Sequence, residues 1–173
     1  TSTGAFSTTG DVNLAANITT TDTNLTIGGN LVIAEAATPT LSTGAGTAGN
    51  VTVTGTTNGT AGGVAETLTV QAGTGTVTFT GNVGNNTDAL ELEALTLTNA
   101  AATTFSGTLD LANALTQTNA ATGATTFTGA VSVGSASLKG TSYAINNSFA
   151  SGGTTAITNS GVITKNATGN ITS

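Results

Sequence analysis

Apolar and polar residues alternate in short runs along most of the chain. The clearest runs are residues 51–54, 67–70, 76–80 and 95–98, where Val, Leu or Phe alternates with Thr. A period of two places the apolar side chains on one face of a β-strand and Thr on the other. Thr and Val are β-branched, which suits a strand, and the Gly, Asn and Ser residues between the runs supply turns. The pattern predicts short strands with one buried face.

Residues 88–95 are the one stretch rich in good helix formers. Leu90 and Leu92 nevertheless fit the alternation of a strand, and Leu95 extends it in part. We therefore predict a strand here as well, and helix almost nowhere.

The strand pattern belongs to an internal repeat. Phe105, Phe127 and Phe149 are equally spaced, and residues 103–111 and 125–133 superpose at every apolar position. Residues 77–83 give the same phrase once more, at a somewhat longer interval upstream. A looser phrase, Gly-x-apolar-x-apolar, begins at Gly10, Gly29, Gly49, Gly107 and Gly129. A period that varies around a constant strand indicates loops of different length.

Repeated short strands at this spacing predict an all-β fold, a parallel β-solenoid of about eight coils with roughly 20–26 residues each. Residues 1–173 would form this single domain, with a length of about 38 Å at the usual strand spacing. A β-sandwich is the alternative, because it also uses short alternating strands with frequent turns; the repeat favours the solenoid. The predicted core ladder is Phe79, Phe105, Phe127, Phe149, Val83, Leu109, Leu111, Val131 and Val133.

Composition excludes several classes of function. The 173 residues contain no His and no Cys, and the only basic residues are Lys139 and Lys165. Mechanisms that need an imidazole, a thiolate or a guanidinium are therefore excluded, and we expect neither an enzyme nor a cofactor. The net charge of −6 disfavours nucleic acid as a partner, since little is available to neutralise phosphates. No run approaches the roughly 18 apolar residues of a membrane helix, so we expect no insertion into membranes.

Three kinds of surface residue are candidates for binding. Asp88, Glu91 and Glu93 form the one acidic cluster, and Asp110 could join it from a neighbouring coil. The cluster could supply a catalytic pair of carboxylates or a calcium site. The simpler interpretation is an acidic turn exposed to solvent. Thr-x-Thr pairs at 76/78, 96/98 and 116/118 could order water and bind ice if they stack on one face. The many Asn-x-Ser/Thr sequences, such as those at Asn17, Asn24 and Asn50, are better explained by Asn ladders that satisfy turns than by glycosylation.

The repeats resemble those of large bacterial surface proteins. Residues 76–84, the two Thr-Thr-Phe-Ser/Thr-Gly units and residues 154–161 look like the β-strand repeats of autotransporter passenger domains and filamentous-haemagglutinin-like adhesins. The resemblance implies a right-handed parallel β-helix on or outside a Gram-negative cell. The shared repeats contain no catalytic or receptor-binding residue, so we predict no catalytic, metal-binding or cofactor-binding residue in this chain.

The ends of a solenoid expose strand edges that normally need a cap. Residues 1–6 and 165–173 offer neither an amphipathic helix nor Pro. We therefore expect an extracellular or cell-surface structural protein whose partners are copies of itself, or a host or cell surface. The leading hypothesis is a self-assembling subunit of a bacterial fibre, sheath or layer; the alternatives are a segment of an adhesin and an ice-binding protein.

Overall fold

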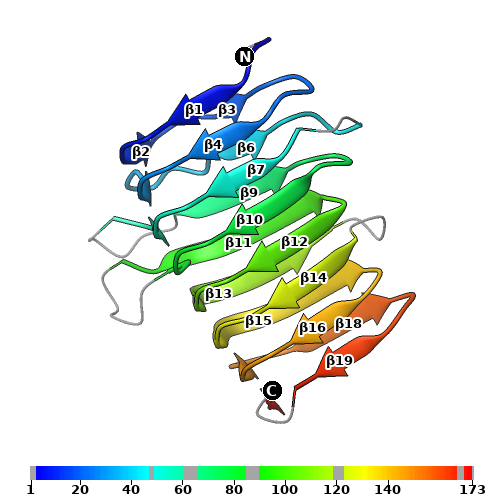
Figure 1. Cartoon of the computed structure of the whole chain (residues 1–173). Coiled ribbons are helices and arrows are strands. Elements are labelled where there is room, and N and C mark those ends of the chain that lie inside the picture. The colour runs from blue at the N-terminus through cyan, green and yellow to red at the C-terminus, as the bar shows by residue number, and fades with distance from the viewer. Residues whose placement is uncertain are drawn as a thin grey trace.

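The computed structural model is an all-β parallel solenoid, as the repeat predicts (Figure 1). It describes residues 3–46, 49–60, 66–84, 90–118, 123–166 and 170–172, and these contain no helix. Each pairing between the named strands is parallel. The chain winds from the N-terminal end of the stack to the C-terminal end in about seven turns.

One continuous sheet of eight strands forms the first face of the solenoid. In order of stacking its strands are β1 (Phe6–Thr8), β4 (Leu25–Ile27), β7 (Val51–Val53), β10 (Thr76–Phe79), β12 (Ala102–Phe105), β14 (Ala124–Phe127), β16 (Tyr143–Ile145) and β19 (Ile163–Lys165). The pairing register shows that the coils differ in length: the coil from Val51 to Val77 is one of the longest, and the coil from Thr125 to Tyr143 is the shortest. Loops therefore vary while the strand position stays fixed.

The remaining strands form the second and third faces. The second face contains β2 (Val12–Leu14), β5 (Leu31–Ile33), β8 (Thr57–Asn58), the bridging residue Val83, the first residues of β13 (Leu109–Gln117) and β15 (Val131–Gly140), then β17 (Phe149–Ser151) and β20 (Ile171–Thr172). The third face contains β3 (Ile18–Thr19), β6 (Thr40–Ser42), β9 (Thr67–Gln71), β11 (Leu92–Asn99), the later residues of β13 and β15, and β18 (Thr155–Asn159). Strands β13 and β15 thus turn the corner between these two faces.

The strand expected over residues 88–95 is confirmed from Leu92 to Leu95, as the first half of β11; Leu90 and Glu91 precede the strand, and residues 88 and 89 lie outside the described residues. The pairing with β13 shifts by one residue between Leu92 and Ala94, and the extra residue is in β13. Leu92 and Leu95 are both buried although an odd step in the sequence separates them. The alternation in the sequence thus loses its phase where the pairing is irregular.

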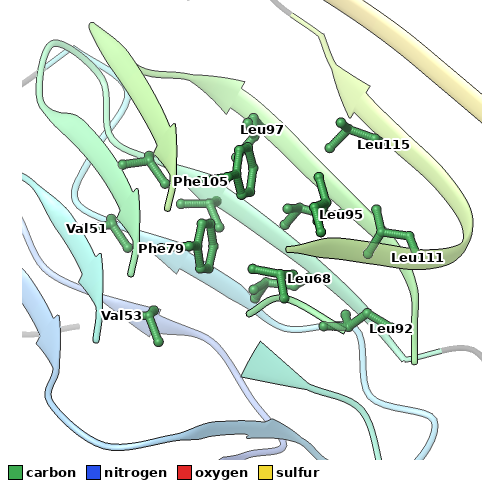
Figure 2. Packing of buried hydrophobic residues seen from close by; sticks show 14 of the residues in the cluster. Val51, Val53, Leu68, Phe79, Leu92, Leu95, Leu97, Phe105, Leu111 and Leu115 are labelled. Carbon is green, nitrogen blue, oxygen red and sulfur yellow. The ribbon is translucent and has the colours of Figure 1, made fainter. Parts of the chain in front are cut away.

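The core consists of columns of apolar side chains that repeat from coil to coil. On the first face, Phe79, Phe105 and Phe127 are in register, and consecutive rings stack with centroids 5.4 and 5.3 Å apart. Figure 2 shows Phe79 and Phe105 within the buried cluster that also holds Leu95. Burying one such ring contributes roughly 1.5–3 kcal/mol, so the column stabilises the middle coils.

All nine residues of the predicted ladder are buried, but they belong to several columns. Phe149 does not continue the phenylalanine column: it lies in β17 on the second face and pairs with Val131. Its ring meets Phe127 edge-on, at 5.5 Å and 76°. The residue that follows Phe127 in the column is Ile145, because this coil is shorter than the interval between the phenylalanines. Phe149 therefore comes after the turn, on the next face.

A column of glycines forms the turn between the first and second faces. A Cβ added at Gly29, Gly55, Gly81, Gly107 or Gly129 would come closer than 3.0 Å to backbone atoms of the glycine in the preceding coil. Real Cβ atoms essentially never approach backbone so closely. Glycine is therefore required at these five positions, whereas the next coil has Asn147 at the equivalent place in the turn.

We predict that Gly81→Ala destabilises the protein by about 1–3 kcal/mol, the usual cost of overpacking. The new Cβ would overlap the carbonyl oxygen of Gly55. Urea unfolding followed by circular dichroism measures the change. Gly10→Ala is the matched control, because Gly10 belongs to the same column and a Cβ there meets nothing within 4 Å; equal losses in both variants would contradict the prediction.

Candidate functional site

The acidic residues do not form a metal centre in the described part of the chain. Asp88 lies outside the described residues. Glu93 in β11 accepts a hydrogen bond from Asn113 Nδ2 at 3.1 Å, and Asp110 lies in β13 on the second face. Within the described ranges no three His, Cys, Asp or Glu side chains are grouped to hold an ion.

Asp110 lines a small hollow on the second face. The hollow has a volume of about 120 Å³ and is bounded by Thr108, Leu109, Asp110, Ala130 and Ser132. Asp110 itself is 9% exposed. The lining offers one carboxylate and two hydroxyls but no basic group, so Asp110 has no second titratable group beside it for acid–base chemistry.

The expected threonine pairs lie on two different faces. Thr96 and Thr116 are in register on the third face, and Thr118 Oγ1 donates to the carbonyl of Thr98 at 3.4 Å. The pair at Thr76 and Thr78 lies on the first face instead. Although the three threonine pairs are equally spaced in the sequence, only the pairs at 96/98 and 116/118 stack on each other.

A longer threonine column runs along the outside of the first face. The central outward residues of five consecutive strands are identical and in register: Thr26, Thr52, Thr78, Thr104 and Thr126. A second, exposed hydroxyl follows two residues later, directly after four of these strands, at Thr54, Thr80, Ser106 and Thr128. The recurrence of Thr52, Thr78 and Thr104 at equal intervals is the sequence signal that could have identified this column.

Asparagine side chains connect successive coils at the turns. Asn24 Oδ1 accepts from the backbone N–H of Asn50 at 2.9 Å, and Asn50 Oδ1 accepts from Thr76 at 2.8 Å. Asn17 Oδ1 likewise accepts from the backbone N–H of Thr40 at 2.8 Å. These amides satisfy turn backbone groups, which is the role expected for Asn in this sequence.

One polar cluster lies inside the core. Gln117, Thr125 and Tyr143 are each 1% exposed. The Gln117 amide donates to Thr125 Oγ1 at 2.9 Å, and the Tyr143 hydroxyl donates to Gln117 Oε1 at 2.7 Å. Burial raises the pKa of Tyr143 to about 12, so the phenol is neutral at physiological pH. The cluster is enclosed and joins the first face to the third face, which is a structural role.

Apolar residues are exposed in the first and last described coils. In the last coil the inward column residues Ile163 and Ile171 are 41% and 40% exposed, and Val162, at the outward position before Ile163, is 69% exposed. At the N-terminal end, Phe6, Val12 and Ile18 are only partly buried against the core. Strands β1 and β19 are the edges of the first face.

Neither a protein-family model, nor a curated protein, nor a solved structure matches this chain significantly. The resemblance to bacterial surface proteins therefore stays a prediction. Among the described segments no helix has the length and hydropathy needed to cross a membrane.

We predict that the buried Tyr143 phenol makes stability depend on pH at the alkaline end. The pKa is about 12 in the folded protein against 10.0 for an ordinary tyrosine, so folding favours the protonated form. This stabilisation is complete below about pH 10 and is lost as the pH rises toward about 12. Urea unfolding at several pH values measures it.

Tyr143→Phe is the comparison variant. It removes the titration, and it costs about 1–3 kcal/mol at neutral pH because Gln117 Oε1 loses its donor. Tyr143 is the one tyrosine in the chain, and every other side chain is the same in both proteins. Parallel losses of stability in both proteins across this alkaline range would contradict the assignment to Tyr143.

Proposed function

We propose that this protein is a non-enzymatic structural subunit that acts outside bacterial cells and assembles with copies of itself. The observation that carries the proposal is the architecture itself: coils stacked by continuous parallel ladders, with a surface that carries few charges. Exposed apolar surface supports it, since Ile163 and Ile171 are 41% and 40% exposed and Phe6 and Val12 are only partly buried.

A strand edge that no further coil covers favours association. An edge strand offers unpaired N–H and C=O groups to a new strand, and native proteins usually block such edges with charge, Pro, a bulge or a covering segment. In the described residues β1 (Phe6–Thr8) carries no charge or Pro, and β19 carries Lys165 alone. Burial of apolar surface would supply affinity for a second copy, and backbone hydrogen bonds between edge strands would fix its orientation.

The surface chemistry supports a structural role over a catalytic one. Charged residues are 6% of the sequence, and imidazole and thiol groups are absent from it. The coils are connected by parallel ladders and Asn side chains along the stack, which makes a stiff rod. A weakly charged, threonine-rich rod suits an extracellular fibre, sheath or layer.

We predict that the protein forms regular filaments as its concentration rises. Negative-stain electron microscopy and static light scattering over a range of concentrations test this. The axial repeat should be near one molecular length, about 38 Å for eight strands at the usual spacing. A protein that stays monomeric at every concentration would overturn the proposed function.

Ice binding is a second candidate function, favoured by the threonine column of the first face. Five threonines in register give methyl and hydroxyl groups repeated every ~4.8 Å along the axis, and Thr54, Thr80 and Thr128 repeat them about 6.7 Å away along the strands. β-branched side chains are stiff at χ1, so such an array holds its geometry. A regular, uncharged array of this kind can hold an ordered layer of water.

We predict thermal hysteresis and shaped ice crystals for the wild-type protein if this candidate is correct. Thr78→Lys should abolish both, because a long hydrated side chain interrupts the array. Thr96→Lys is the matched control, since Thr96 occupies the equivalent outward position on the third face. Ordinary freezing of the wild-type protein would eliminate ice binding.

A further inference from the structure

The hollow beside Asp110 is formed by two neighbouring strands of the second face. Strands β13 and β15 pair in parallel there, with Asp110 opposite Ser132, and they lie side by side in Figure 1. Thr108 and Ala130 directly precede these two strands, and the Leu109 N–H donates to the Ala130 carbonyl at 2.9 Å. The four outward positions therefore form a rectangle, about 4.8 Å between the strands and about 6.6 Å along them.

Three corners of this rectangle carry side-chain oxygen atoms, and the fourth is open. Asp110 supplies a carboxylate, and Thr108 and Ser132 supply hydroxyls from exposed side chains. Ala130 has only a methyl group, so its corner leaves space between the other three. The volume of about 120 Å³ exceeds the roughly 30 Å³ that one water molecule takes in the liquid. A small ion with part of its hydration shell therefore fits.

The Asp110 carboxylate is removed from solvent without a compensating partner. The residue is 9% exposed. Its backbone N–H donates to the Val83 carbonyl at 2.7 Å, but among the described residues its side chain forms no hydrogen bond or ion pair. Burial of a carboxylate is costly unless the group is paired or binds a metal. Lys139 lies on the third face and Lys165 on the first, so a cation from solution is the partner that this carboxylate lacks.

The donor atoms of the hollow favour a hard cation. All of them are oxygen atoms, and the chain has neither His nor Cys to bind a softer metal. Calcium accepts six to eight oxygen ligands in irregular arrangements, waters included, whereas magnesium demands an octahedral shell and loses its waters reluctantly. Two hydroxyls and one carboxylate at fixed strand positions therefore suit calcium better. A single negative charge predicts weak binding, with a dissociation constant of about 10⁻⁴–10⁻³ M.

We propose that the hollow between Thr108, Asp110 and Ser132 binds a calcium ion. Asp110 supplies the charge, the two hydroxyls supply neutral oxygen ligands, and water fills the open corner at Ala130. The site differs from the predicted acidic cluster, since no second acidic residue takes part in it. Because Ser132 belongs to the coil after Asp110, the ion connects two coils of the solenoid. The site goes beyond the proposed function and does not depend on assembly.

Thermal unfolding in increasing calcium chloride tests the site, with sodium chloride at equal ionic strength as the reference. Calcium at ten times its dissociation constant should raise the unfolding temperature of the wild-type protein by about 3–6 °C, because the ligands come together only in the folded chain. Magnesium at the same concentration should give a smaller rise. An unfolding temperature that calcium leaves unchanged would overturn the proposal.

Asp110→Asn separates ion binding from a structural role of the carboxylate. The variant keeps the size of the side chain and removes its charge, so the rise with calcium should disappear. Without calcium it should unfold at the same temperature as the wild-type protein or higher, because an unpaired charge is no longer buried. Asp22→Asn is the matched control: Asp22 is exposed between β3 and β4, and this variant should keep the full rise. Equal calcium responses of the wild-type protein and Asp110→Asn would place the ion elsewhere and refute the site.

Ser132→Ala tests a neutral ligand without disturbing the core. The Ser132 side chain is exposed, and Ala150 occupies the same column in the next coil. Loss of its hydroxyl should weaken calcium binding at least about threefold, since affinity depends on the ligand set. Ser137→Ala, at an exposed outward position of the third face, is the control and should bind calcium like the wild-type protein. An unchanged affinity of Ser132→Ala would contradict the assigned ligands; either failure leaves the proposed assembly standing.

Discussion

The parallel backbone ladder sets the separation of successive coils, and the rest of the structure depends on this constraint. Neighbouring strands lie about 4.8 Å apart, so a side chain has its counterparts in the adjacent coils as its nearest neighbours. Phenylalanine rings therefore stack on phenylalanine rings, as Phe79, Phe105 and Phe127 do, and the glycine turns approach to the limit of backbone contact. The same constraint leaves Asn side chains within reach of the next turn, where they bind its backbone.

The architecture could be predicted from the sequence because the ladder imposes a local rule. Alternation in each strand identifies the inward face, and the phrases at residues 103–111 and 125–133 fall in register in the structure. The alternation does not predict the length of each coil, because that length depends on the turns between the strands. Phe149 shows the effect: Ile145 already completes the coil that begins at Phe127, so the more distant Phe149 falls on another face. The threonine pairs separate between two faces for the same reason.

Contacts between side chains of different faces could not be predicted from the alternation of apolar and polar residues either. Gln117 follows the leucine-rich column of the third face at the position of Leu97, and alternation alone marks it as a polar residue placed inward. The hydrogen-bond partners of the Gln117 side-chain amide are Thr125 and Tyr143, which come from later strands of the first face. Such a cluster fixes the relative register of the faces in the C-terminal half, because a slip of one coil would leave the amide without partners.

The coil-by-coil connectivity has a mechanical consequence. Each strand of the first face pairs only with the coils directly before and after it, so a pull on the two termini along the axis loads the coils in series. The end coil detaches first, and the others follow one at a time. Each released coil lengthens the chain by about 60–90 Å, against the ~4.8 Å that it occupied in the stack. A rod of this design therefore yields in steps under tension and extends many-fold before its covalent chain bears the load.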